Sequence, residues 1–358
     1  MTAGRTRQVL VVDDSAVVRE TLSALINRHP QLEVMATAKD PYEAAERMRE
    51  QIPDVITLDV EMPRMDGISF LRRLMSQRPI PVVICSSLVG QGTETLLAAL
   101  ESGAVDIVQK PAVGTKRFLE ESAILIQDKV LAAAHARLPS GSGRKSVQRM
   151  PTNRAQSRPP RAMVKTTQTI VAIGSSTGGT EALREILTAL PPFSPPILIV
   201  QHMPEHFTGA FAERLSQQSQ ITVREARDGD RALRGTALVA PGNHHLMLTR
   251  SGAEYRVKVA EGPLVSRHRP SADVLFRSVA KYAGKNAVGV ILTGMGSDGA
   301  QGLKEMRSSG AHTIGQDEAS CVVYGMSRAA KAAGAVVEEM PLSDISDALV
   351  ELGRESAA

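Results

Sequence analysis

Tryptophan is missing from the sequence, and tyrosine and phenylalanine alone supply the 3% of its 358 residues that are aromatic. The cores must therefore be built from aliphatic side chains, which is typical of parallel sheets that are buried on both faces. Cysteine is also scarce. Cys85 and Cys321 lie in locally apolar stretches, which fits buried, reduced thiols better than a disulfide scaffold, and we expect neither to be catalytic.

No uninterrupted apolar run approaches the roughly 20 residues that a membrane-spanning helix needs. The first residues also lack the apolar segment that is found in signal peptides. We therefore expect a cytoplasmic protein without membrane insertion.

Acidic residues are missing from residues 137–168, where eight lysine and arginine residues occur. The whole chain has a formal charge of +4, and subtracting these eight charges leaves −4 for the remainder. The basic character therefore belongs to one segment. A DNA-binding regulator would need basic patches on its folded parts, so we expect no nucleic-acid partner.

The length exceeds what one core usually organises, so two domains are expected. In the first 138 residues, short β-rich runs alternate with helical patterns, as in βαβ units around a parallel sheet. Strands are expected at 8–13, 32–36, 55–59, 82–85 and 107–109, and helices at 16–28, 42–51, 69–77, 94–101 and 116–136. This pattern predicts a five-stranded, flavodoxin-like α/β domain over 1–138.

Residues 139–167 are rich in Pro, Ser, Gly, Gln and Arg and poor in large apolar residues. Such a segment buries too little surface to offset the entropy of ordering it, so we expect a flexible linker. Two interpretations of its positive charge stay open: it serves solubility alone, or it weakly attracts an acidic partner.

The β/α alternation resumes over 168–358. Strands are expected at 169–174, 197–201, 237–240, 246–249, 255–259, 288–293 and 312–314, and helices at 180–190, 208–218, 272–283, 299–308 and 326–333. The sequence thus predicts a second, doubly wound α/β domain with a small antiparallel hairpin around Ser251 and Gly252.

Chemically useful side chains follow four strands of the first domain. Asp13 and Asp14 end the first strand, Asp59 the third, Ser86 the fourth and Lys110 the fifth. The carboxyl ends of parallel strands meet at one edge of the sheet, so these groups should lie together. Clustered carboxylates favour a hard cation such as Mg²⁺, beside which a carboxylate can attack a phosphoryl group.

The motifs Val-Asp-Asp-Ser at 12–15, Asp-Val-Glu-Met-Pro-Arg-Met-Asp-Gly at 59–67 and Lys110-Pro111 resemble those of the response-regulator receiver family. The resemblance implies that a chemotaxis histidine kinase phosphorylates Asp59. It further implies that Mg²⁺ is held by Asp13, Asp14, Asp59 and the backbone carbonyl of Glu61, and that Ser86 and Lys110 form the switch. One departure is Ile107, where many receivers carry an aromatic residue.

The second domain begins with an apolar strand that runs into Gly174-Ser175-Ser176-Thr177-Gly178-Gly179 and then a helix. Gly174, Ser176 and Gly178 fit a nucleophile elbow, which exposes a serine at a helix N-terminus where free N–H groups favour an oxyanion. The same turn could instead hold a phosphate, although it lacks the lysine of a P-loop and the full Gly-x-Gly-x-x-Gly of a dinucleotide fold.

A base and an orienting acid follow two other strands. His202 comes directly after the strand at 197–201, and Asp298 follows the strand at 288–293. Ser176, His202 and Asp298 therefore all lie just past the carboxyl end of a strand, and catalytic triads occur in any chain order.

The segments Ile173-Gly-Ser-Ser-Thr-Gly-Gly-Thr180, Gln201-His-Met-Pro204 and Leu292-Thr-Gly-Met-Gly-Ser-Asp-Gly299 resemble the catalytic motifs of the chemotaxis protein-glutamate methylesterase family. The resemblance implies Ser176 as nucleophile, His202 as general base and acid, and Asp298 as orienting acid. Met295 would be a backbone oxyanion donor, and Thr177 would support His202.

The same resemblance implies a phosphorylation-activated hydrolase that demethylates γ-glutamyl methyl esters on chemoreceptors and deamidates receptor glutamines. The protein would be monomeric and recruited to receptor arrays. The alternative is a response regulator whose output domain binds a nucleotide or a partner without catalysis.

Two further features of the second domain bear on its site. The histidine pairs at 202 and 206 and at 244 and 245 lack the partners of a zinc site, so we expect no cofactor in the catalytic domain. Arg267 and His268 precede a predicted helix, where they either line a substrate groove or belong to an exposed loop.

Overall fold

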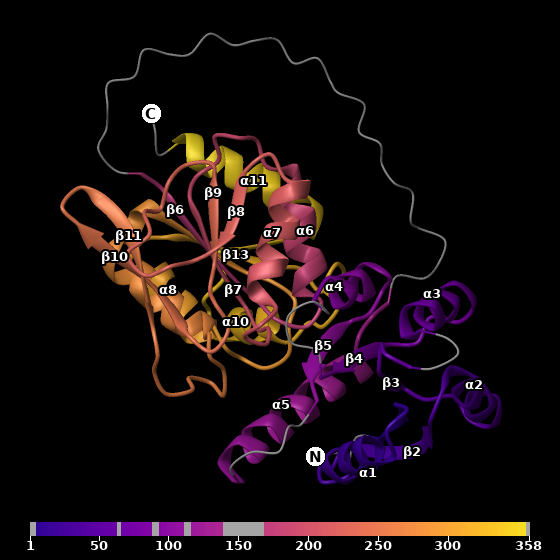
Figure 1. Cartoon of the computed structure of the whole chain (residues 1–358). Coiled ribbons are helices and arrows are strands. Elements are labelled where there is room, and N and C mark those ends of the chain that lie inside the picture. The colour runs from indigo at the N-terminus through magenta and orange to yellow at the C-terminus, as the bar shows by residue number, and fades with distance from the viewer. Residues whose placement is uncertain (1–4, 63–65, 88–92, 111–115, 139–167, 356–358) are drawn as a thin grey trace, which may run out of the picture.

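A computed structural model of the chain describes residues 5–62, 66–87, 93–110, 116–138 and 168–355. These residues form two α/β domains (Figure 1). The predicted flexible linker at 139–167 lies outside the described residues. In the part of the chain that is described, no helix is both long and apolar enough to span a bilayer.

The first domain is a parallel sheet with the strand order β2-β1-β3-β4-β5. Its elements are β1 (Arg7–Val12), α1 (Ala16–Ile26), β2 (Leu32–Ala38), α2 (Pro41–Glu50), β3 (Val55–Leu58), α3 (Gly67–Gln77), β4 (Val82–Ser86), α4 (Thr93–Glu101), β5 (Asp106–Gln109) and α5 (Lys116–Ala134). The five predicted strands and five predicted helices are confirmed. Asp40 begins α2 by accepting hydrogen bonds from two backbone N–H groups of its first turn.

The second domain is built on a seven-stranded sheet with the order β14-β13-β12-β6-β7-β9-β8, in which every pairing is parallel. The strands are β6 (Ile170–Ser175), β7 (Ile197–Gln201), β8 (Thr222–Glu225), β9 (Thr236–Val239), β12 (Ala287–Ile291), β13 (His312–Gln316) and β14 (Glu338–Met340). The helices are α6 (Gly179–Ala189), α7 (Thr208–Gln218), α8 (Ala272–Tyr282), α9 (Ala300–Ser308), α10 (Met326–Ala332) and α11 (Leu342–Glu355), with a 3₁₀ turn η1 (Gly284–Asn286).

The predicted hairpin is confirmed as the antiparallel pair β10 (His245–Ser251) and β11 (Glu254–Ala260), which packs on α8. Strands β8 and β14 and helix α11 were not predicted. Both strands are short edges of the sheet and carry charged residues, so neither has the apolar run of a central strand. Helix α11 buries Ile345 and Leu349, a four-residue spacing that is visible in the sequence.

The sheet reverses its strand order between β6 and β12, which are neighbours although they are far apart in the chain. Crevices at such switch points, outside the carboxyl ends of the strands, are where doubly wound folds bind ligands. The segments after β6, β7 and β12, which carry the three predicted catalytic residues, therefore converge.

Helix α5 and strand β5 of the first domain lie against the carboxyl edge of the second sheet (Figure 1). Ion pairs join Arg214 to Glu101 and Arg137 to Glu318 across the domain boundary. The backbone N–H of Gly178, at the start of α6, donates to the carbonyl of Val105 at 3.3 Å. Both cysteines are buried and unpaired, as predicted.

Candidate functional site

Ser176 lies in a tight turn between β6 and α6. Its N–H donates to the carbonyl of Thr293 at 3.0 Å, and its own carbonyl accepts from Gly179 N–H at 2.7 Å and from Gln201 Nε2 at 2.9 Å. Gly178 has φ +78, a left-handed conformation that favours glycine. The elbow predicted from the sequence is therefore present, and strands β7 and β12 hold it from both sides.

Gly294, after β12, allows the two loops to meet. A Cβ at this position would lie 2.7 Å from the Cβ of Ser176 and 2.4 Å from the sulfur of Met326. Only glycine leaves room there, so the loop that leads to Asp298 can pass directly beside the serine.

His202 Nε2 lies 2.9 Å from Asp298 Oδ2. The Asp298 carboxylate also accepts hydrogen bonds from Ser271 Oγ at 2.6 Å and from Ala272 N–H at 2.7 Å, at the N-terminus of α8. Burial alone would raise the pKa of Asp298, but the hydrogen bonds from His202, Ser271 and Ala272 outweigh it and lower this pKa to about 2. Asp298 is therefore an ionised partner that fixes the imidazole.

The low pKa of Asp298 predicts a pH-dependent contribution to stability. Because its folded-state pKa lies below the ordinary value of 3.8, this stabilisation is present above about pH 4 and is lost as the pH falls towards 2. This shift of almost two pKa units corresponds to roughly 2–3 kcal/mol. Urea unfolding should show that the difference in the free energy of unfolding between wild type and Asp298→Asn is smaller at pH 3 than at pH 5. An equal difference at the two pH values would contradict this.

His202 Nδ1 is buried and has no hydrogen-bond partner among the described residues. With Nε2 engaged by Asp298, Nδ1 is the atom left to take a proton. No hydrogen bond joins it to Ser176 Oγ in the described part of the chain, but both residues lie where the segments after β6 and β7 converge. Catalytic hydrogen bonds often form only when substrate binds.

His268 stacks on His202, with ring centroids 3.8 Å apart and an angle of 17° between the planes. Burial and the neighbouring His202 lower the pKa of His268 to about 2, so it is neutral in the ordinary pH range. The neutral ring covers one face of the buried His202 imidazole. The sequence left the role of this segment open, and the structure places it at the site.

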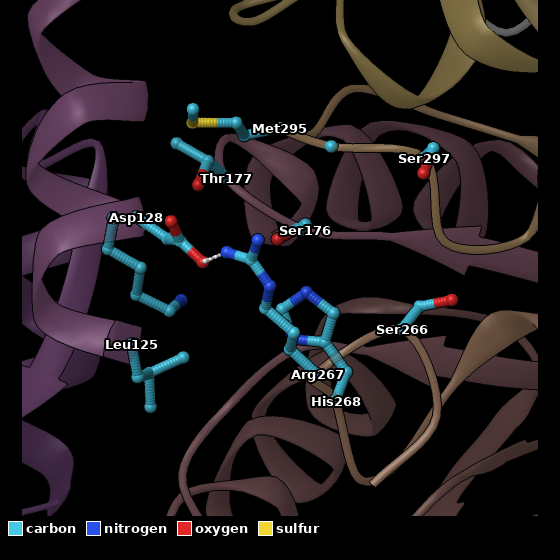
Figure 2. A pocket seen from close by; sticks show the side chains of 11 residues that line it. Leu125, Asp128, Ser176, Thr177, Ser266, Arg267, His268, Met295 and Ser297 are labelled. Carbon is cyan, nitrogen blue, oxygen red and sulfur yellow. Dashed lines mark hydrogen bonds and ion pairs between the residues drawn. The ribbon is translucent and has the colours of Figure 1, made fainter. Parts of the chain in front are cut away.

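The two predicted supporting residues, Thr177 and Met295, line one cavity of about 300 Å³ together with Ser176 (Figure 2). No described group accepts a hydrogen bond from the backbone N–H of Met295. The Thr177 hydroxyl donates to Asp106 Oδ2 of the first domain at 2.7 Å, not to His202, so its support of the base stays a prediction.

The first domain closes this cavity from the opposite side. Leu125, Asp128 and Lys129 of α5 form its wall (Figure 2). Lys129 is 4% exposed, pairs with Asp106 Oδ1 and donates to the carbonyl of His202 at 3.1 Å. A buried ion pair of the first domain thus contacts both Thr177 and His202.

The second predicted site lies at the carboxyl edge of the first sheet. Oxygen atoms of Asp13, Asp14 and Asp59 lie within 4.8 Å of one another. Lys110 Nζ lies 2.6 Å from Asp13 Oδ2 and 2.9 Å from Asp59 Oδ2. Burial raises the pKa of Asp13 despite Lys110. Three carboxylates against one ammonium leave excess negative charge, which fits a divalent cation.

Ser86 and Glu61 border this acidic site. Ser86 is buried at the end of β4, and its carbonyl accepts from Lys110 N–H at 2.8 Å. Glu61 N–H donates to Asp59 Oδ1 at 3.2 Å, and the metal-binding role of the Glu61 carbonyl stays a prediction. Lys110 also lines a cavity with His202 and Arg267, so the acidic site and the serine site flank the same domain boundary.

Two family models match the chain: the response regulator receiver domain over residues 9–121 and CheB methylesterase over residues 171–349. A protein-glutamate methylesterase/protein-glutamine glutaminase of Geobacter metallireducens is 58% identical over 96% of this chain and 98% of its own length. A relative with the same activity name from Anaeromyxobacter dehalogenans is 58% identical over 99% of this chain and 98% of its own.

The crystal structure of the Thermotoga maritima CheB methylesterase catalytic domain is 36% identical, with a TM-score of 0.51, and the match covers 52% of this chain and 99% of that one. The nearly full-length relatives share one activity name, which argues against a non-catalytic output domain. The chain belongs to the CheB methylesterase family and carries a response-regulator receiver domain ahead of its catalytic domain.

Proposed function

We propose that this chain is a protein-glutamate methylesterase that also deamidates protein glutamine, as its relatives are named. Its substrates would be γ-glutamyl methyl esters on the helical signalling region of chemoreceptors. The observation that carries the proposal is the buried His202–Asp298 hydrogen bond next to the Ser176 elbow, at the switch point of the sheet.

In the proposed reaction, Ser176 Oγ attacks the ester carbonyl and His202 Nδ1 takes its proton. The backbone N–H of Met295 would stabilise the oxyanion, and Thr177 would support His202. The carbon–oxygen bond to the methoxy group then breaks, and His202 returns the proton to the departing methanol. Water, activated by His202, releases glutamate from the acyl-enzyme. With a glutamine substrate, ammonia leaves in place of methanol.

We also propose the division into a receiver domain at 1–138, a linker at 139–167 and a catalytic domain at 168–358. A chemotaxis histidine kinase would phosphorylate Asp59. Asp13, Asp14, Asp59 and the Glu61 carbonyl would hold Mg²⁺, which neutralises charge during phosphoryl transfer. The protein would act as a monomer in the cytoplasm at receptor arrays, without a nucleic-acid partner.

Strand β5 supports a coupling between the two proposed sites. Lys110, directly after this strand, pairs with Asp59, and Asp106, at its start, contacts Thr177 and Lys129. We infer that a phosphoryl group on Asp59 draws Lys110 and Ser86 towards its oxygens. This movement would weaken the contacts of β5 and α5 with the serine site and favour an open enzyme.

Methanol release from a methylated receptor fragment tests both the proposed function and its regulation by phosphorylation. An acyl phosphate with Mg²⁺ should raise the rate of the full chain by about tenfold or more, because a shift of about 1.4 kcal/mol already changes the equilibrium constant between the closed and open enzyme tenfold. Asp59→Asn is the matched control and should show no increase. Equal rates with and without the phosphodonor would refute the coupling.

A further inference from the structure

The turn at Val265–His268 has an unusual backbone beside the serine site. Val265 and His268 exchange both backbone hydrogen bonds, at 3.1 and 2.9 Å, and the two residues between them have positive φ: 51° at Ser266 and 67° at Arg267. Two such residues define a turn that strongly favours Asn-Gly. Among the described residues, one other non-glycine residue has positive φ. Ser266 and Arg267 therefore adopt a backbone conformation that their residue types disfavour, and they do so next to the cavity that contains Ser176.

The turn holds Arg267 over the cavity that contains Ser176 (Figure 2). Its guanidinium extends across this cavity and forms an ion pair with Asp128 Oδ2 of α5, at 3.4 Å. Within the described part of its own domain, no acidic side chain pairs with it. An arginine that lines the same cavity as Ser176 and has no anionic partner in the described part of its own domain is suited to bind a carboxylate.

Helix α5 carries the carboxylate that Arg267 binds in this structure. It presents Leu125, Asp128 and Lys129 to the cavity, and the spacing of three and four residues places them on one face of the helix. Helix α5 therefore occupies the side of the Ser176 cavity to which the proposed helical substrate would bind. The side chains of Arg267 and Asp128 are 69% and 28% exposed, so their ion pair is weak and exchangeable.

We propose that Arg267 forms a carboxylate subsite, which binds an acidic side chain one helical turn from the scissile ester. In the closed enzyme Asp128 occupies this subsite in place of the substrate. The inference rests on the proposed methylesterase function, because that function makes the substrate an acidic helix. The enzyme should therefore prefer methyl esters that have a glutamate or aspartate one helical turn away.

Two synthetic helical peptides test the subsite in the full chain with an acyl phosphate and Mg²⁺. Each carries a single γ-methyl glutamate, flanked four residues away on both sides by glutamate or, in the matched peptide, by glutamine. We expect kcat/KM to be about tenfold higher for the acidic peptide, which corresponds to the strength of a charge-assisted hydrogen bond. Arg267→Ala should reduce this ratio to about one, and Arg267→Glu should invert it.

Arg231 provides the matched control, because it forms an exposed ion pair with Glu254 on the β10–β11 side of the domain. Arg231→Ala should keep the tenfold ratio. A ratio that survives in Arg267→Ala, or that disappears equally in Arg231→Ala, overturns the subsite. Hydrolysis of both peptides at equal rates by the wild type also overturns it while leaving the esterase function intact.

A binding measurement separates the subsite from the chemistry. In a Ser176→Ala background, the affinity for a fluorescent acidic peptide should depend on Arg267 even if no peptide is hydrolysed, and failure to hydrolyse would then count against the proposed function alone. Without the phosphodonor, adding Asp128→Asn should raise this affinity severalfold. An unchanged affinity would show that Asp128 does not occupy the subsite.

Discussion

Replacing Asp298 with asparagine should lower kcat for ester hydrolysis by about four orders of magnitude, the effect of losing the orienting carboxylate in a serine triad. Asp298 Oδ2 accepts from His202 Nε2, which leaves Nδ1 unprotonated and ready to act as base. Asparagine can donate to Nε2 instead, so the imidazole proton would move to Nδ1 and the base would be blocked. Methanol release in the presence of the phosphodonor measures the loss.

Two variants bracket this result. Ser176→Ala should reduce the rate at least as far as Asp298→Asn, because the triad acts as a unit and single losses do not add. Ser271→Ala removes one donor to the Asp298 carboxylate and leaves the backbone N–H of Ala272 in place. It should cost about tenfold. If Asp298→Asn keeps more than a tenth of the activity, another group orients His202.

The meeting of Ser176, His202 and Asp298 could be predicted because it depends on one rule of parallel sheets. Each residue follows a strand, and the carboxyl ends of parallel strands share an edge. The acidic site at Asp59 followed from the same rule. Neither prediction required any knowledge of how the two domains pack.

The contacts that close the serine site could not be predicted in this way. Thr177 and Asp106 are 71 residues apart and belong to different domains, so no strand pattern relates them. Arg267 was also not assigned, because Ser-Arg is not a recognised sequence for its turn and only the backbone angles reveal it. Sequence periodicity reports the faces of elements within a domain and carries no information on domain docking.

Replacing Lys129 with methionine should release the unphosphorylated enzyme from its closed state. In the closed state Asp106 is 7% exposed, and without Lys129 its charge would retain only the hydrogen bonds from Thr177 Oγ1 and Ile107 N–H. Breaking one side of a buried ion pair costs about 3 kcal/mol or more. In the open state water can reach Asp106, so the variant destabilises the closed state alone. The equilibrium between the closed and open enzyme should shift towards the open enzyme by about a hundredfold.

The rate without phosphodonor should therefore approach that of the phosphorylated wild type, which is the upper limit that opening can reach. Arg214→Ala breaks the exposed interdomain pair with Glu101, and because exposed pairs contribute about 0–1 kcal/mol, it should raise the rate by no more than about fivefold. Adding Asp106→Leu to Lys129→Met removes the unpaired charge and should restore much of the closed state. A Lys129→Met enzyme that stays as inactive as the unphosphorylated wild type, but responds normally to the phosphodonor, would show that this ion pair does not hold the domains together.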